Sequence, residues 1–171
     1  MYKYETHLHT SPVSRCAIAS VEESLKYYKE LEYDGVFITN HFPDLNGTFD
    51  PEKTYEENIN YYFSDYEKAL ELSETIGIKV FGGVETSYGG TDFLVYGLDK
   101  EWFLAHPEFN NMRQSDKLTL MRESGALIIQ AHPFREAFYI DHIRLFPRHI
   151  DGVEIVNTNR PEDENNLSKI Y

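Results

Sequence analysis

Cysteine is almost absent from this 171-residue sequence, which contains only Cys16 and therefore cannot form an internal disulfide bond. A chain without disulfides fits a reducing compartment. Long apolar runs are also missing, since even the apolar stretch at 126–129 is far too short to cross a membrane. The first residues, MYKYETHLH, lack the apolar segment of a signal peptide. We therefore expect a cytoplasmic protein that has no membrane partner.

Positive charge is scarce as well. Sixteen lysines and arginines stand against 29 aspartates and glutamates, and the formal net charge is −13. The basic residues are scattered along the chain and form no cluster. Such a surface repels nucleic-acid phosphates and anionic lipids, so we expect no nucleic-acid partner. Composition does not indicate the oligomeric state.

The remaining composition is that of an ordinary globular domain. Hydrophobic residues make up 41% of the chain and charged residues 26%, which is enough apolar material for a core. The sequence contains no internal repeat and no low-complexity segment. We therefore expect one domain over residues 1–171.

Helix signals alternate with short apolar segments along the chain. Capping boxes at 20–23 and 54–57 predict two helix starts, and Gly77 predicts the end of the second helix. Another helix is expected over 115–124, and a last one from Pro161. Strands are expected over 1–8, 34–39, 79–84, 92–96, 126–131 and 152–156. Alternating helices and apolar strands predict parallel pairing and an α/β fold.

Four histidines and one glutamate each lie where an expected strand ends. In parallel α/β sheets and barrels these ends converge on one ligand-binding face. Taken singly, such residues are more often loop histidines, caps or surface glutamates, but the joint pattern predicts one shared metal site. The five expected ligands are His7, His9, His41, Glu85 and His132.

The residue types suit divalent cations. His7 and His9 are two positions apart, so in a strand both imidazoles point to the same side and reach one cation or two neighbouring cations. Glu85 offers a carboxylate that can bridge two cations about 3.5–4 Å apart. Zinc, manganese and iron are the expected metals. Because bound histidines must be deprotonated, metal affinity is expected to fall below about pH 6.

Four segments resemble motifs of the polymerase and histidinol phosphatase (PHP) superfamily. They are HLHT at 7–10, ITNH at 38–41, GVE at 83–85 and QAHPFR at 130–135. The resemblance extends to about Arg160. It implies a distorted (β/α)7 TIM-like barrel that binds up to three Zn, Mn or Fe ions. Many members of the superfamily hydrolyse phosphate esters, and others are exonucleases or accessory domains.

Position by position, the resemblance assigns the five expected ligands and suggests further site residues. Asp92 aligns with a position that often holds a metal-binding histidine, although a strand-start cap is the alternative. Arg135 is the best candidate for a phosphate clamp, and Arg15 and Arg160 flank the same face. Cys16 lies where the family often has another ligand. A thiolate there could bind metal, but we expect a buried, small apolar role instead.

The family's last motif, a Gly-Ser-Asp-x-His-like segment with two more ligands, does not occur in this sequence. We therefore expect a C-terminally truncated domain whose barrel lacks its C-terminal strand or strands and is open. A natural variant with a depleted site is the alternative. Such a chain should hold fewer metals, or hold them more weakly, and be nearly inactive.

The expected activity is that of a metal-dependent phosphoesterase. Its substrate would be a small phosphorylated molecule, bound at a dinuclear or trinuclear site at the carboxyl ends of the strands. Two alternatives remain open at this point. One is a non-catalytic metal-binding regulatory or accessory domain, and the other is a different metal-dependent hydrolase, such as an amidohydrolase.

Overall fold

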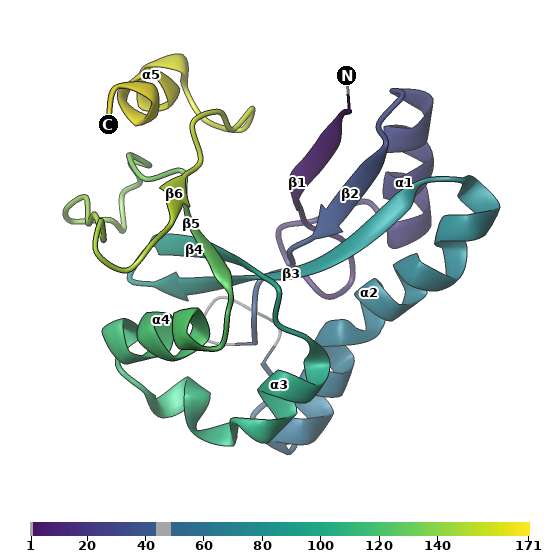
Figure 1. Ribbon diagram of the computed structural model, residues 1–171, viewed down its shortest axis with the longest axis horizontal. Helices are drawn as coiled ribbons and strands as arrows, with labels where there is room; N and C mark the ends of the chain where they lie inside the picture. The colour runs from purple at the N-terminus through teal and green to yellow at the C-terminus, as the bar shows by residue number, and fades with distance from the viewer. Residues whose placement is uncertain (1, 44–48) are drawn as a thin grey trace.

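A computed structural model describes residues 2–43 and 49–171 (Figure 1). In these residues six strands form one curled sheet in chain order. The strands are β1 (Tyr4–Leu8), β2 (Gly35–Ile38), β3 (Lys79–Tyr88), β4 (Thr91–Tyr96), β5 (Leu127–Ala131) and β6 (Gly152–Val153). The helices are α1 (Val21–Glu30), α2 (Tyr55–Ile76), α3 (Lys100–Ala105), the 3-10 helix η1 (Pro107–Asn111), α4 (Gln114–Glu123) and α5 (Glu162–Ile170). The α/β class expected from the sequence is confirmed.

Both predicted capping boxes are present. The Ser20 side chain caps α1 and the Thr54 side chain caps α2, each reciprocally with the glutamate three residues later. Helix α2 ends at Gly77, whose φ of 74° lies in the left-handed region that glycine adopts without strain. Local sequence therefore determines where these two helices begin and where the longer one ends.

The expectation of an all-parallel sheet is wrong at β4. Strands β1–β2, β2–β3 and β5–β6 pair in parallel, but β4 is antiparallel to both β3 and β5. The reason is the connection between β3 and β4, which consists only of Gly89 and Gly90 with φ values of 56° and 85°. A two-residue turn of this kind joins antiparallel strands, whereas a parallel crossover needs a dozen or more residues.

Two further strands differ from their expected bounds, and one helix was not expected. Strand β3 continues four residues past the expected 79–84, so Glu85 lies inside the strand rather than after it. Strand β6 is shorter than the expected 152–156. Helix α3 was not predicted, because its six residues are too few to show helical periodicity; the Asp99 side chain caps it by accepting from the Trp102 N–H at 2.8 Å.

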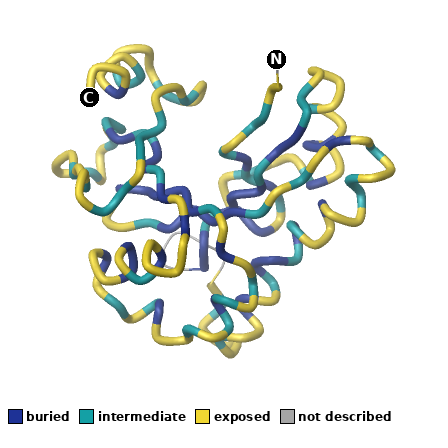
Figure 2. Tube along the Cα trace, viewed as in Figure 1, coloured by how far each residue is buried: buried dark blue, intermediate teal, exposed yellow. Residues whose placement is uncertain are grey.

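The apolar core has two parts that meet at α2. One part includes Phe42, Phe93 and Phe103, all fully buried, and lies between the β3–β5 strands and helices α2 to α4. The other part includes Leu25 and Val36 and lies between α1, α2 and the β1–β2 strands. Figure 2 shows that burial is concentrated along the sheet and on the helix faces that cover it. Helices α1, α2 and α4 thus cover the outer face of the sheet, whereas α5 lies apart from them (Figure 1).

The sheet curls into a half-barrel whose edges are β1 and β6 (Figure 1). These two strands are not paired with each other in the described residues. Side chains connect the two halves instead, since His7 Nδ1 lies 2.9 Å from Glu154 Oε1 and the Tyr96 hydroxyl donates to the Thr6 carbonyl at 2.8 Å. The curled sheet is consistent with a partial TIM-like barrel, and the (β/α)7 arrangement stays a prediction. No helix of the described residues is long and apolar enough to cross a bilayer.

Candidate metal centre

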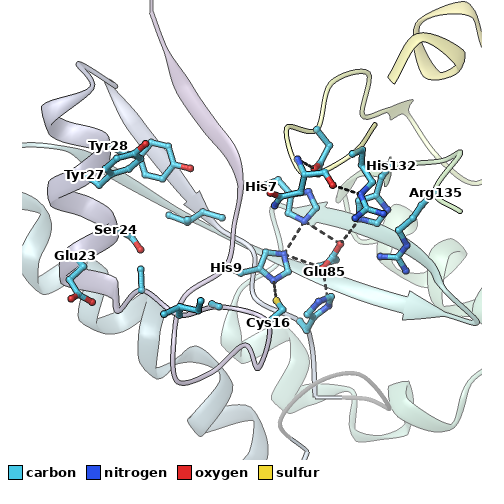
Figure 3. A pocket seen from close by; sticks show the side chains of 18 residues that line it. His7, His9, Cys16, Glu23, Ser24, Tyr27, Tyr28, Glu85, His132 and Arg135 are labelled. Carbon is cyan, nitrogen blue, oxygen red and sulfur yellow. Dashed lines mark hydrogen bonds and ion pairs between the residues drawn. The ribbon is translucent and has the colours of Figure 1, made fainter. Parts of the chain in front are cut away.

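The five predicted ligands lie together at one end of the half-barrel. Figure 3 shows His7, His9, Glu85 and His132 at this site. His7 is in β1 and His9 directly follows it, while His41 follows β2 and forms an isolated bridge with Glu85 of β3. His132 follows β5, at an unusual φ of 28°. All five residues line one cavity of about 860 Å³. Their role as metal ligands stays a prediction.

The Glu85 carboxylate is the centre of this group. Its side chain is only 1% exposed. Oxygen Oε1 lies 3.2 Å from His7 Nε2 and 3.5 Å from His132 Nε2. Oxygen Oε2 lies 3.2 Å from His9 Nε2 and 2.8 Å from His41 Nδ1. Each carboxylate oxygen thus faces a different pair of imidazoles.

The contacts of Glu85 fit a cation better than a set of hydrogen bonds. In the described part of the chain, neither Glu85 oxygen nor His41 Nδ1 has a hydrogen-bond partner of acceptable geometry. His7 Nε2 and His9 Nε2 lie 2.9 Å apart, each 3.2 Å from a different oxygen of Glu85. A buried carboxylate that lacks well-directed hydrogen bonds is costly, and a divalent cation would lower that cost. The residues present therefore fit bound metal.

Two groups of three potential ligands occur among the described residues. In each group the ligand atoms all lie within 4.8 Å of one another. One group is His7, Glu85 and His132, and the other is His9, Cys16 and His41. The expected buried apolar role of Cys16 is wrong, because Cys16 is exposed and its Sγ lies 3.3 Å from His9 Nδ1.

Electrostatics in the centre favour protonated imidazoles when no cation is bound. Burial lowers the pKa of His7, but the carboxylates of Glu154 and Glu85 outweigh it and raise that pKa to about 10. Burial likewise lowers the pKa of His41, and contacts with Cys16 and Glu85 raise it to about 10. For Glu85 burial raises the pKa, yet the four imidazoles hold it well below its ordinary value. Without a cation the centre therefore balances one carboxylate with imidazolium groups.

This balance predicts a pH dependence of metal binding. A cation must displace protons from His7 and His41, whose raised pKa values of about 10 keep them protonated at neutral pH. Metal affinity should therefore keep rising as the pH increases from about 6 toward about 10. Ligands with an ordinary histidine pKa of roughly 6.5 would be deprotonated well below about pH 10, and the affinity would then be constant. Calorimetric titration with zinc at pH 7, in buffers of different ionisation enthalpy, should show proton release. An affinity that is constant between pH 7 and 9 would contradict this expectation.

Glu154 belongs to the site and was missed by sequence reasoning. Its Oε1 lies 2.9 Å from His7 Nδ1, and its Oε2 accepts the His132 backbone N–H at 2.9 Å. The Asn157 amide donates to both oxygens at 3.2 Å. A carboxylate that holds the far nitrogen of a histidine orients the near nitrogen toward the metal and raises its basicity. The only local signal was an acidic residue inside the apolar segment GVEIV.

Replacing Glu154 with glutamine should lower metal affinity by about 10–100-fold, the usual effect of losing an outer partner of a ligand. The amide keeps the volume of the side chain but removes the negative charge beside His7. Competition with a chromophoric chelator measures the change. The matched control is Glu123→Gln at an exposed position, which should leave affinity unchanged. Equal affinities for the two variants would remove Glu154 from the centre.

Two further predicted residues are bound to each other beside the centre. Asp92 is 1% exposed, and its Oδ2 lies 3.7 Å from His132 Nε2 but 2.9 Å from Arg135 Nη1. The Arg135 Nη2 donates to the Gly90 carbonyl at 2.9 Å. Asp92 is in neither group of potential ligands. Its ligation and the phosphate-clamp role of Arg135 stay predictions.

The other two arginines differ in their position. Arg160 lines the cavity, from the segment before α5. Arg15 is exposed and does not line that cavity, so the structure does not bring it to the centre. Among the described residues, Arg135 and Arg160 are thus the arginines along the cavity wall.

A buried polar network holds the loop after β1 against the end of β2. The Asn40 side-chain oxygen accepts from the Thr10 N–H at 2.7 Å and from the Ser14 hydroxyl at 2.9 Å. The Thr10 hydroxyl donates to Asp65 of α2 at 2.7 Å, and the Ser14 hydroxyl oxygen accepts the His41 N–H at 2.9 Å. These bonds fix the segments that carry His9, Cys16 and His41 relative to one another.

Comparison with known proteins identifies the fold. Neither a protein-family model nor a curated protein matches the sequence. Among solved structures, a two-domain protein from Bacteroides vulgatus that contains a predicted PHP-like metal-dependent phosphoesterase is similar over 90% of this chain and 44% of its own, with a TM-score of 0.64 and 14% identity. A protein from Bifidobacterium adolescentis, whose description as a metal-dependent phosphoesterase is also a prediction, is similar over 99% of this chain and 82% of its own, with a TM-score of 0.63 and 12% identity.

These similarities show a PHP-like fold, which confirms the fold resemblance drawn from the motifs. This chain spans less than half the length of the Bacteroides vulgatus protein. At 12% and 14% sequence identity, these structural similarities establish the fold of the chain but not its chemistry. The function must therefore be inferred from the residues of the centre itself.

Proposed function

We propose that this protein is a metal-dependent phosphoesterase that acts on a small phosphorylated molecule. The observation that carries the proposal is Glu85, a buried carboxylate whose two oxygens face four imidazoles at the wall of a cavity. The description of two proteins of the same fold as metal-dependent phosphoesterases supports it.

Glu85 would hold two divalent cations rather than act as a base. His7 and His132 would complete one position through Oε1, and His9 and His41 the other through Oε2. Zinc, manganese and iron are the candidate metals. When bound, such cations supply a water nucleophile near neutral pH and polarise a phosphoryl oxygen.

The protein's own residues would orient the substrate. The net charge of −13 repels phosphate, so cationic side chains at the cavity are needed. Arg135 and Arg160 line the cavity and are the candidates to bind phosphoryl oxygens. A cavity of about 860 Å³ accommodates a small organic phosphate together with the metals. Nucleic acid is not an expected substrate, given the acidic surface.

A non-catalytic metal-binding domain is the second candidate. It is favoured by the state of Arg135, whose guanidinium already contacts Asp92 and the Gly90 carbonyl. Phosphate binding would have to compete with, or share, these contacts. An arginine held in this way also fits a purely structural role.

The experiment is a hydrolysis assay on p-nitrophenyl phosphate and a panel of small phosphomonoesters, with the protein loaded with zinc, manganese or iron. Because the sequence lacks the family's last ligand motif, we expect weak metal-dependent turnover, which is lost in Glu85→Gln. Metal binding without turnover of any phosphoester would favour the non-catalytic domain. Hydrolysis of amide substrates alone would favour an amidohydrolase.

A further inference from the structure

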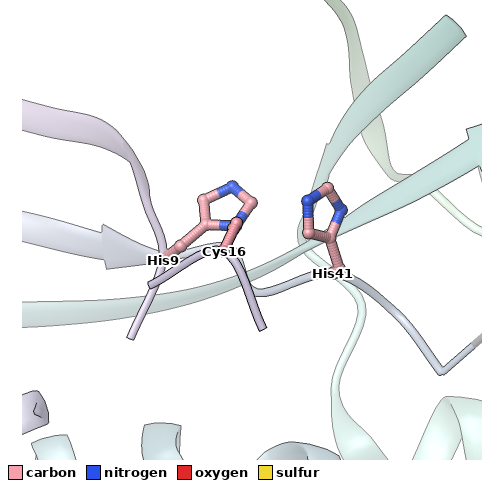
Figure 4. A group of neighbouring side chains, drawn as sticks. All are labelled: His9, Cys16 and His41. Atoms are coloured by element: carbon pink, nitrogen blue, oxygen red, sulfur yellow. The ribbon is translucent and has the colours of Figure 1, made fainter. Parts of the chain in front are cut away.

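Cys16 places a sulfur atom next to the imidazole nitrogens and the carboxylate oxygens of the centre. It follows β1 in the same loop as His9, and its Sγ is 3.3 Å from His9 Nδ1. It lines the cavity and is solvent-exposed. Figure 4 shows Cys16 beside His9, with His41 opposite. One ligand atom from each of the three residues lies within 4.8 Å of the others.

A second observation, independent of the cysteine, points to a cation at this position. The Glu85 side chain is 99% buried, and its Oε2 has no hydrogen-bond partner of acceptable geometry among the described residues. That oxygen is directed at this group, 3.2 Å from His9 Nε2 and 2.8 Å from His41 Nδ1. The buried anionic oxygen lies beside two imidazoles, and the thiol lies beside one of them; nitrogen, oxygen and sulfur atoms of this kind are the donors that a soft-to-borderline divalent cation binds.

The loop that carries Cys16 is also held in place before any ligand binds. Ser14, which is 1% exposed, donates its hydroxyl to Asn40 at 2.9 Å and accepts the His41 N–H at 2.9 Å. The Ala17 N–H donates to the Ser14 carbonyl at 3.1 Å, which closes the turn around Cys16. The backbone segments that carry Cys16 and His41 are therefore held relative to each other through Ser14. Such preorganisation is what a metal site requires.

We infer that Cys16 is a thiolate ligand of the cation bound by His9 and His41, and that this sulfur makes the position select zinc over manganese. The inference rests on the proposed metal centre. Thiolates prefer zinc and other soft or borderline cations, whereas manganese prefers oxygen ligands. The other position, with His7, Glu85 and His132, offers only nitrogen and oxygen. The two positions should therefore differ in metal preference.

Cobalt substitution tests this inference without relying on catalysis. A thiolate bound to cobalt(II) gives an intense charge-transfer absorption in the near ultraviolet, which nitrogen and oxygen ligands do not give. Because Cys16 is the only cysteine of the chain, that band has a single possible thiolate source. We expect the band to saturate at an intensity that corresponds to one thiolate–cobalt bond per chain and to disappear in Cys16→Ser. Zinc should also protect the thiol from a disulfide reagent, and a chelator should restore its reactivity.

Metal selectivity is the second measurement. Competition dialysis of zinc against manganese should show a preference at this position that falls by about tenfold or more in Cys16→Asp, since even outer-shell losses change affinity by roughly 10–100-fold. Ile18→Ser is the matched control, because Ile18 lies in the same loop and is fully exposed. Circular dichroism of each variant verifies that the fold is retained.

The outcomes separate this inference from the proposed function. Cobalt bound without the thiolate band, or unchanged zinc affinity in a folded Cys16→Ser variant, overturns the role of Cys16 even if the protein is a phosphatase. A thiolate band in a protein that hydrolyses no phosphoester supports Cys16 and rejects the proposed function.

Discussion

Replacing Glu85 with glutamine is expected to remove both cation positions at once. One oxygen of Glu85 faces His7 and His132, and the other faces the remaining two imidazoles of the centre. Glutamine keeps the shape but is neutral, and its NH2 group cannot ligate. The surrounding imidazoles hold the pKa of Glu85 well below its ordinary value, so the wild-type carboxylate is charged at neutral pH. The substitution therefore removes a full negative charge from the cation site. Affinity should fall by more than about 100-fold, beyond the effect of an outer-shell change.

Elemental analysis after dialysis measures the metal content of this variant. His132→Ala is the informative comparison, because it should impair only the position that includes His7. Glu101→Gln, at an exposed site, should retain the wild-type content. If Glu85→Gln bound as much metal as the wild type, Glu85 would not be the shared ligand and the two-position arrangement would be wrong.

Replacing Asn40 with alanine should produce a large loss of stability. Asn40 is 1% exposed, and its side chain bonds to Thr10, Ser14 and Asp65, which are also buried. Each buried group left without a partner costs about 1–3 kcal/mol, so we expect the free energy of unfolding to fall by about 3 kcal/mol or more. Urea denaturation followed by circular dichroism measures this change.

Asn166→Ala is the control for this variant, since Asn166 is exposed in α5 and should change stability by less than about 0.5 kcal/mol. The Asn40 variant should also bind metal more weakly, because Asn40 holds Ser14 and Ser14 accepts the His41 N–H. A loss of less than about 1 kcal/mol would mean that water satisfies the partners of Asn40 and that the network does not fix the loop.

Local features were readable from the sequence because their physics is local. A capping box satisfies the first N–H groups of a helix within four residues, and both predicted boxes occur at the starts of α1 and α2. The β3–β4 turn is equally local, since Gly89 and Gly90 both have positive φ, yet the prediction of parallel strands overlooked it. That error misplaced the end of β3 and put Glu85 after the strand instead of inside it.

The sequence by itself determined the α/β class, the helix starts and the set of five residues that meet at the centre. Only the tertiary structure decided which imidazole faces which oxygen of Glu85, that Cys16 lies beside His9, and that Arg135 is bound to Asp92. It also revealed Glu154, which contacts His7 across 147 positions of the chain. The physical reason is that hydrogen bonds and metal ligation depend on distances of about 2–3 Å between atoms. Those distances are set by the curl of the sheet, and no local pattern of residues contains them.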